Sequence, residues 1–125
     1  MAPRVLLVDD DPDVVDQIRD VLQANGFETT TATTFDGGRQ LLEAEPPPDV
    51  LIADVRLGQF NGLQLVMRRN PATRAVVISG YWDHTLEEEA RRLGAEYLLK
   101  PIRNEQLVAS VRRAIAAPPR TPQAS

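Results

Sequence analysis

Five polar residues in this chain stand directly after short apolar runs, and their types could together perform phosphoryl chemistry. The pairs are Val5–Val8 with Asp9 and Asp10, Val50–Ala53 with Asp54, Ala75–Ile78 with Ser79, and Tyr97–Leu99 with Lys100. Ligands of an open parallel sheet bind beyond the carboxyl ends of its strands, so these side chains are predicted to converge. Carboxylates, a hydroxyl and an ammonium group in one place suit a magnesium ion and a phosphoryl group.

The three aspartates predict a cation site. Carboxylates held close together repel one another unless a cation lies between them. Magnesium prefers hard oxygen ligands and takes only a few carboxylates. The alternative, that acids after strands merely cap helices, suits Asp11 and Asp13. It suits Asp54 poorly, because the next predicted helix begins several residues later.

Lys100 and Ser79 complete the predicted electrostatics. Lys100 is the only lysine in the chain, so its place at a strand end is informative. An ammonium group can bridge a carboxylate and a phosphate oxygen. Ser79 has the alternative of being a turn residue before Gly80. Pro101 lowers the cost of a cis peptide after Lys100 to about 0.5–1 kcal/mol, which leaves both isomers open.

Short strands alternate with amphipathic helices along the chain. The threonine-rich strand Glu28–Ala32 is predicted near a sheet edge, and a helix over about Phe35–Glu45 ends before Pro46. Five strands and five helices in strict alternation predict an α/β fold, a parallel sheet with helices on both faces. We expect one domain over residues 1–117 and a proline-rich disordered tail, or the start of a linker, over 118–125.

Composition narrows the function classes. A net charge of -4 argues against a nucleic-acid-binding surface, and no cysteine is present for disulfides or thiolate metal sites. The start of the chain leaves no room for a signal peptide, and no apolar run approaches the roughly 20 residues of a membrane span. We therefore expect a cytoplasmic protein without membrane association.

The motifs resemble the receiver domain of bacterial two-component response regulators over about residues 4–116. The matching stretches are Leu6–Asp11, Asp54 with Asn61-Gly62, Val77–Gly80, Leu93–Ala95 and Tyr97–Pro101. The resemblance implies a doubly wound, flavodoxin-like fold with strand order 2-1-3-4-5. It also implies a phosphorylated switch in phosphorelay signal transduction rather than an enzyme that turns over an external substrate.

The resemblance also implies a role for each site residue. Asp54 would be the phosphoacceptor; Asp9, Asp10, Asp54 and the backbone carbonyl of Arg56 would hold magnesium; Lys100 and Ser79 would stabilise the phosphoryl group; Ser79 and Tyr97 would be the switch residues. The donor would be a sensor histidine kinase or a phosphotransfer protein. Phosphorylation would change the surface of the fourth helix, fifth strand and fifth helix, which is also a candidate for homodimer contacts.

The chain departs from the family pattern in a few places. Gly58 stands where the family usually has proline, and the short segment between Asp54 and Ser79 predicts a third helix cut by about one turn. Arg56 and Tyr81 follow Asp54 and Ser79 by two positions, at the predicted rim of the site. We hypothesise that their bulk restricts the water that hydrolyses the acyl phosphate.

Two alternatives remain open. The first is a receiver-like interaction module that phosphate does not control. The second is a small phosphatase of the haloacid dehalogenase type, which also uses an aspartate nucleophile. The stretch Asp9–Asp13 contains the Asp-x-Asp spacing of that family, but the chain lacks the cap that usually forms its substrate pocket.

Overall fold

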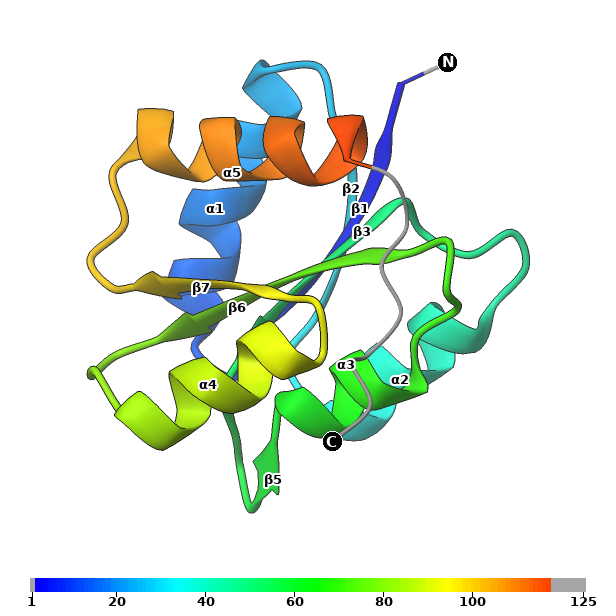
Figure 1. The fold of residues 1–125 in the computed structure, drawn as a ribbon. Coiled ribbons are helices and arrows are strands. Elements are labelled where there is room, and N and C mark those ends of the chain that lie inside the picture. Colours follow the sequence, from blue (N-terminus) through cyan, green and yellow to red (C-terminus); the bar gives the residue numbers. More distant parts are fainter. Residues whose placement is uncertain (1, 118–125) are drawn as a thin grey trace.

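A parallel sheet of five strands forms the centre of the computed structural model, which describes residues 2–117 (Figure 1). The strands, which include the short pair β4 and β5 outside this sheet, are β1 (Arg4–Val8), β2 (Glu28–Ala32), β3 (Val50–Asp54), β4 (Arg56–Leu57), β5 (Phe60–Asn61), β6 (Arg74–Ser79) and β7 (Glu96–Leu99). The helices are α1 (Pro12–Ala24), α2 (Phe35–Glu43), α3 (Leu63–Arg68), α4 (His84–Arg92) and α5 (Asn104–Ala116). The predicted tail over 118–125 lies outside the described residues.

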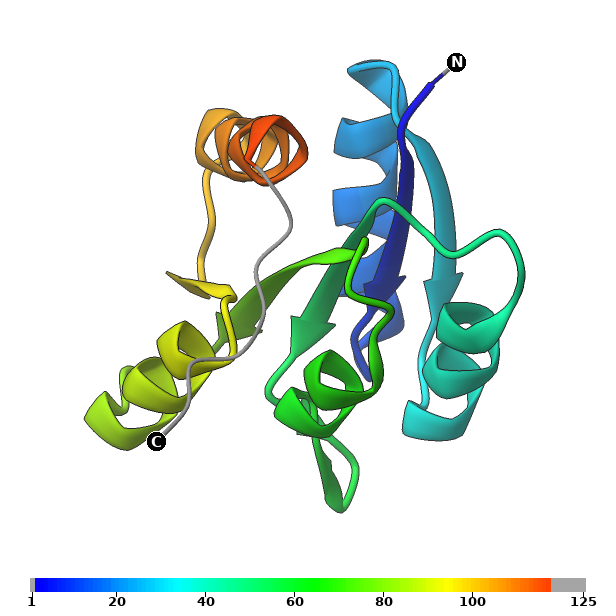
Figure 2. The same ribbon diagram turned by 45° about the vertical axis from the view of Figure 1, so that its right-hand side comes forward.

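The strand order of the large sheet is β2-β1-β3-β6-β7, and every neighbouring pair is parallel. Because the short strands β4 and β5 form a separate pair, this order confirms the predicted 2-1-3-4-5 arrangement. Helices α1 and α5 cover one face, and α2, α3 and α4 cover the other (Figure 2). The threonine-rich strand β2 lies at an edge, as its composition predicted.

Alternation of side chains along each strand divides the core into two layers. In β1, Leu6 and Val8 pack toward α2, α3 and α4, whereas Val5 and Leu7 pack toward α1 and α5. All five residues of β3 are buried, as expected for the central strand of a sheet covered on both faces. This packing holds the carboxyl ends of β1 and β3 side by side.

Local signals set the helix boundaries. Asp11 is the N-cap of α1, where its side chain accepts a hydrogen bond from the amide of Asp13, and Pro12 occupies the first turn. Gly94 follows α4 with a φ of 81°, a conformation that favours glycine. Helix α2 ends at Glu43, two residues before the predicted Glu45.

A two-stranded antiparallel hairpin, β4–β5, lies between Asp54 and α3, and the sequence patterns did not predict it. Gly58 lies in its turn with a φ of 64°, which a proline cannot adopt because its ring holds φ near about −65°. The ring of Phe60 stacks on Phe35 with centroids 4.6 Å apart. The predicted short third helix is confirmed, since α3 has six residues.

None of the helices within residues 2–117 is both long and apolar enough to cross a membrane.

Candidate functional site

Three carboxylates meet at the carboxyl ends of β1 and β3. Oxygen atoms of Asp9, Asp10 and Asp54 all lie within 4.8 Å of one another. Asp9 and Asp54 are buried, with 0% and 5% of their surface exposed, whereas Asp10 is exposed. The backbone amide of Asp11 donates to Asp9 Oδ1 at 3.0 Å, and that of Arg56 donates to Asp54 Oδ1 at 3.3 Å. The parallel strands thus bring together residues 45 positions apart in the chain.

Lys100 bridges the two buried carboxylates. Its Nζ lies 2.9 Å from Asp9 Oδ2 and 3.3 Å from Asp54 Oδ2. Burial alone would lower the pKa of Lys100, but the hydrogen bond to Asp9 and the charge of Asp54 outweigh it and raise that pKa. The backbone amide of Lys100 donates to Ser79 O at 2.8 Å, and the peptide between Lys100 and Pro101 is cis. The lysine is therefore charged and aimed into the acid cluster.

The carboxyl group of Asp54 has an unusual proton affinity. Burial, followed by the nearby charge of Asp9, raises the pKa of Asp54 to about 6. The Lys100 ammonium and the amide of Arg56 pull in the opposite direction but only in part. At neutral pH Asp54 is thus an ionised carboxylate in a place that disfavours its negative charge, which makes it receptive to an electrophile or a cation.

The donor set of the acid cluster fits a hard cation. Three carboxylate groups from two strand ends supply only oxygen ligands, and magnesium binds in proteins through a few carboxylates with water completing its shell. Within residues 2–117 these three acids are the one group of this kind whose ligand atoms converge. A cation here would also relieve the mutual repulsion of Asp9 and Asp54.

Two hydroxyl groups share one backbone acceptor beside the cluster. Ser79 is buried, and its Oγ donates to the carbonyl oxygen of Tyr81 at 2.6 Å. The Tyr97 hydroxyl donates to the same oxygen at 3.0 Å. Position 79 at the end of β6 therefore carries an inward hydroxyl whose hydrogen bond is directed to the β6–α4 loop. The shared acceptor was not visible in the sequence, because both hydrogen bonds depend on how that loop folds back.

The two large side chains that the sequence predicts at the rim of the site, Arg56 and Tyr81, contact each other. The guanidinium carbon of Arg56 lies 5.0 Å from the ring centroid of Tyr81, within the range of a cation–π contact. Both residues are exposed. This contact links the short strand β4, which follows β3, to the β6–α4 loop.

Comparisons with known proteins agree with this geometry. The family model of the response regulator receiver domain matches residues 5–112. The chain belongs to this family. In curated proteins, it is 34% identical over 118 residues to the DNA-binding transcriptional regulator NtrC of Escherichia coli, covering 90% of this chain and 24% of that one. The chain spans less than half the length of the first curated relatives that it matches.

Solved structures confirm the fold. A CheY-like receiver domain protein from Methanospirillum hungatei superposes with a TM-score of 0.86 at 24% identity, covering 92% of this chain and 94% of that chain. A response regulator protein from Burkholderia pseudomallei, solved with a phosphorylated aspartic acid, calcium ion and citrate, gives a TM-score of 0.79 at 25% identity. It covers 93% of this chain and 75% of that chain. Receiver domains are generally regulatory, bind magnesium at an acidic pocket, and interact with histidine kinases or phosphotransfer proteins.

One residue that positions this receiver domain's acids was missed in the sequence. A Cβ atom on Gly62 would lie only 2.0 Å from the carbonyl oxygen of Asp54. The Gly62 amide also donates to Val55 O at 2.8 Å. The sequence showed Asn61-Gly62 as one of the stretches that resemble the receiver family, but nothing in its spacing indicated that its backbone packs against Asp54.

Proposed function

We propose that this receiver domain accepts a phosphoryl group on Asp54 and thereby switches a protein-interaction surface. The observation that carries the proposal is the position of Lys100 Nζ, 2.9 Å from Asp9 and 3.3 Å from Asp54. A lysine in that place neutralises the acceptor before transfer and can follow the charge onto a phosphoryl oxygen afterwards. If these acids only capped helices or formed an ordinary structural ion pair, three converging carboxylates would not be needed.

The transfer is a displacement at phosphorus. An Asp54 carboxylate oxygen forms a bond to the phosphorus of a phosphohistidine, the P–N bond breaks, and its electron pair stays on the imidazole nitrogen. Asp9, Asp10, Asp54 and the backbone carbonyl of Arg56 would hold a magnesium ion. That ion would supply positive charge next to the phosphoryl oxygens. Lys100 holds a second positive charge there, and Ser79 can donate its hydroxyl proton to a phosphoryl oxygen.

The switch follows from the shared acceptor. If the Ser79 hydroxyl turns to the phosphoryl group, the Tyr81 carbonyl loses its 2.6 Å hydrogen bond and keeps only that of Tyr97. The β6–α4 loop and Tyr97 are then free to adopt a second arrangement, biased by the new charge. The readout surface is α4, β7 and α5, which is also where a homodimer would form.

The phosphodonor docks beside α1 in this proposal. An apolar groove of about 430 Å³ lies between α1 and the beginning of α5. Val14 and Ile18 of α1 line one side, and the groove reaches Gly80 and Lys100 at the phosphorylation site. This continuity suits a helix of a sensor kinase or phosphotransfer protein whose histidine must approach Asp54. The domain itself contacts neither nucleic acid nor membrane in this proposal, and it works in the cytoplasm.

The rim residues set the lifetime of the phosphorylated state. Arg56 and Tyr81 contact each other over the site, where they restrict the approach of water to the acyl phosphate. Replacement of both by alanine is expected to accelerate the loss of phosphate from Asp54, as measured by intact mass over time. An unchanged rate in the double variant would disprove this role.

The proposal is tested by intact mass after incubation with magnesium and acetyl phosphate, for wild type and Asp54→Asn in parallel. One added phosphoryl group on wild type alone supports it. No adduct on either protein would favour an interaction module that phosphate does not control. An adduct on both would mean that another residue is the acceptor. Turnover of a chromogenic phosphate ester would instead favour the phosphatase alternative.

A further inference from the structure

A second polar cavity lies at the end of the sheet opposite Asp54. It has a volume of about 580 Å³ and lies at the amino ends of β6 and β7, beside the last turns of α4 and α5. Small residues, Ala75 in β6, Ala95 just before β7 and Ala114 in α5, leave the space open. Pockets that hold small ligands span roughly 300–1,000 Å³, so the cavity has a suitable size.

Four arginines from separate segments line this cavity: Arg69 just after α3, Arg74 in β6, Arg91 in α4 and Arg113 in α5. Glu96 is the one carboxylate among the described residues that line it. Among the described residues that line the cavity, guanidinium groups thus outnumber carboxylates, although the whole chain has a net charge of -4. A lining of this composition favours anions over cations.

The two inner arginines are held rigidly by backbone carbonyls. Arg69 donates to Val66 O and Leu93 O, both at 2.8 Å, near the ends of α3 and α4. Arg74 donates to Ala117 O, at the end of α5, at 3.2 Å from Nε and 2.9 Å from Nη2. These contacts hold both guanidinium groups in place. Among the described residues, no carboxylate forms an ion pair with Arg74.

The two outer arginines keep most of their donors available. Arg91 uses one nitrogen for Glu87 at 3.4 Å, and Arg113 uses one for Glu96. Their side chains remain 72% and 59% exposed. A guanidinium group has five N–H donors in a planar fork that matches phosphate oxygens, and surface ion pairs of this kind exchange partners at little cost.

Helix polarity alone does not account for this arrangement. Basic residues are favourable at any helix C-terminus. The last turns of α1 and α2 nevertheless contain none, whereas basic residues occur in the last turns of α3, α4 and α5. The arginines thus gather on the half of the sheet that contains the cavity.

We propose that this cavity binds a small anion with two linked phosphate groups, held by Arg91 and Arg113, with the charge of Arg74 behind them. Each of the two outer guanidinium groups can hold one phosphate group through its planar fork of donors. Two linked phosphate groups can therefore engage both outer arginines, and a diphosphate is small enough for the available volume. The inference does not depend on phosphorylation of Asp54.

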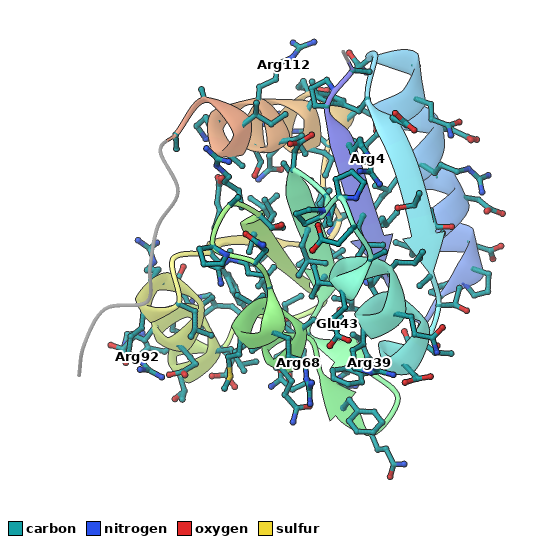
Figure 3. The ribbon with its side chains drawn as sticks, turned by 90° about the vertical axis from the view of Figure 1, so that its right-hand side faces the viewer. Arg4, Arg39, Glu43, Arg68, Arg92 and Arg112 are labelled. Atoms are coloured by element: carbon teal, nitrogen blue, oxygen red, sulfur yellow. The ribbon has the colours of Figure 1, made fainter. Side chains whose placement is uncertain are left out.

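The test is calorimetric titration of the full chain with inorganic pyrophosphate in 0.15 M salt and EDTA. We expect saturable one-to-one binding, and Arg113→Gln or Arg91→Gln should weaken it by about tenfold or more. Matched controls are Arg112→Gln and Arg92→Gln, which make the same charge change one position away and do not line the cavity. Both control side chains extend outward from their helices (Figure 3). They should change affinity less than about twofold.

Absence of saturable binding would overturn the proposal. An equal loss in all four variants would also overturn it, because it would mean diffuse attraction to surface charge. Amide chemical shifts in a ¹H–¹⁵N spectrum locate the ligand independently. Pyrophosphate should shift the amides of Gly94 and Glu96, which line the cavity. Shifts confined to Gly80 and Lys100 would place the anion at the phosphorylation site instead and refute the proposal.

Discussion

Replacement of Asp54 by asparagine is expected to stabilise the metal-free fold at pH 7.5. Burial and the charge of Asp9 raise the pKa of Asp54 from 3.8 to about 6. A group whose pKa is raised by folding stabilises the fold fully only below its unfolded pKa. That contribution is lost as the pH rises through about 6. At pH 7.5 the ionised carboxylate therefore destabilises the fold, and asparagine removes this charge.

The magnitude follows from the shift. At about 1.4 kcal/mol per pKa unit, the rise in the pKa of Asp54 corresponds to about 3 kcal/mol of unfolding free energy at pH 7.5 and about 1 kcal/mol at pH 4.5. Asparagine also weakens the contact with Lys100, and we take the resulting loss of stability as about 1 kcal/mol. The net gain is then about 2 kcal/mol at pH 7.5 and close to zero at pH 4.5.

The assay is urea denaturation in EDTA at several pH values, followed by circular dichroism and by the fluorescence of Trp82, the only tryptophan. Asp20→Asn is the control, because it removes an exposed carboxylate and should stay within about 0.5 kcal/mol of wild type at each pH. A variant at position 54 that is less stable than wild type at pH 7.5 would refute the reasoning. So would a gain that does not change with pH.

Four further substitutions test the packing of the site and the core. Lys100→Met leaves two buried carboxylates facing each other and should lower the unfolding free energy by about 2 kcal/mol at pH 7.5. Urea denaturation measures this loss of stability, and added magnesium should partly reverse it. Gly62→Ala should cost about 2 kcal/mol or more, because its Cβ meets the Asp54 carbonyl, whereas Gly80→Ala meets nothing within 4 Å and should cost under about 0.5 kcal/mol. Ser110→Ala should raise thermal stability by about 1 kcal/mol, since the buried Ser110 hydroxyl has no hydrogen-bond partner within residues 2–117; a loss of stability would contradict this.

Surface contacts between helices illustrate what local sequence signals leave undetermined. Arg39 and Arg68 both approach Glu43, at 3.1 and 3.9 Å, and so link α2 to α3 (Figure 3). The pair between Arg39 and Glu43 follows from helical spacing, because residues four apart share a helix face. The contact from Arg68 does not, because it depends on how the two helices pack side by side on one face of the sheet.

The sequence by itself determined the sheet, the alternation of helices and the convergence of Asp9, Asp54 and Lys100. These features follow from the sequence because apolar runs become buried strands, and parallel strands place their carboxyl ends at one edge of the sheet. The helix caps were equally local, since a cap bonds to an amide two or three residues away.

Only the tertiary structure decided the β4–β5 hairpin, the approach of Gly62 to Asp54 and the acceptor shared by Ser79 and Tyr97. It also decided the arginine-lined cavity, whose residues come from separate elements. These features join segments that are distant in the chain or loops whose path is set by packing. No periodicity or short motif encodes such contacts, because their geometry exists only once helices and sheet have packed together.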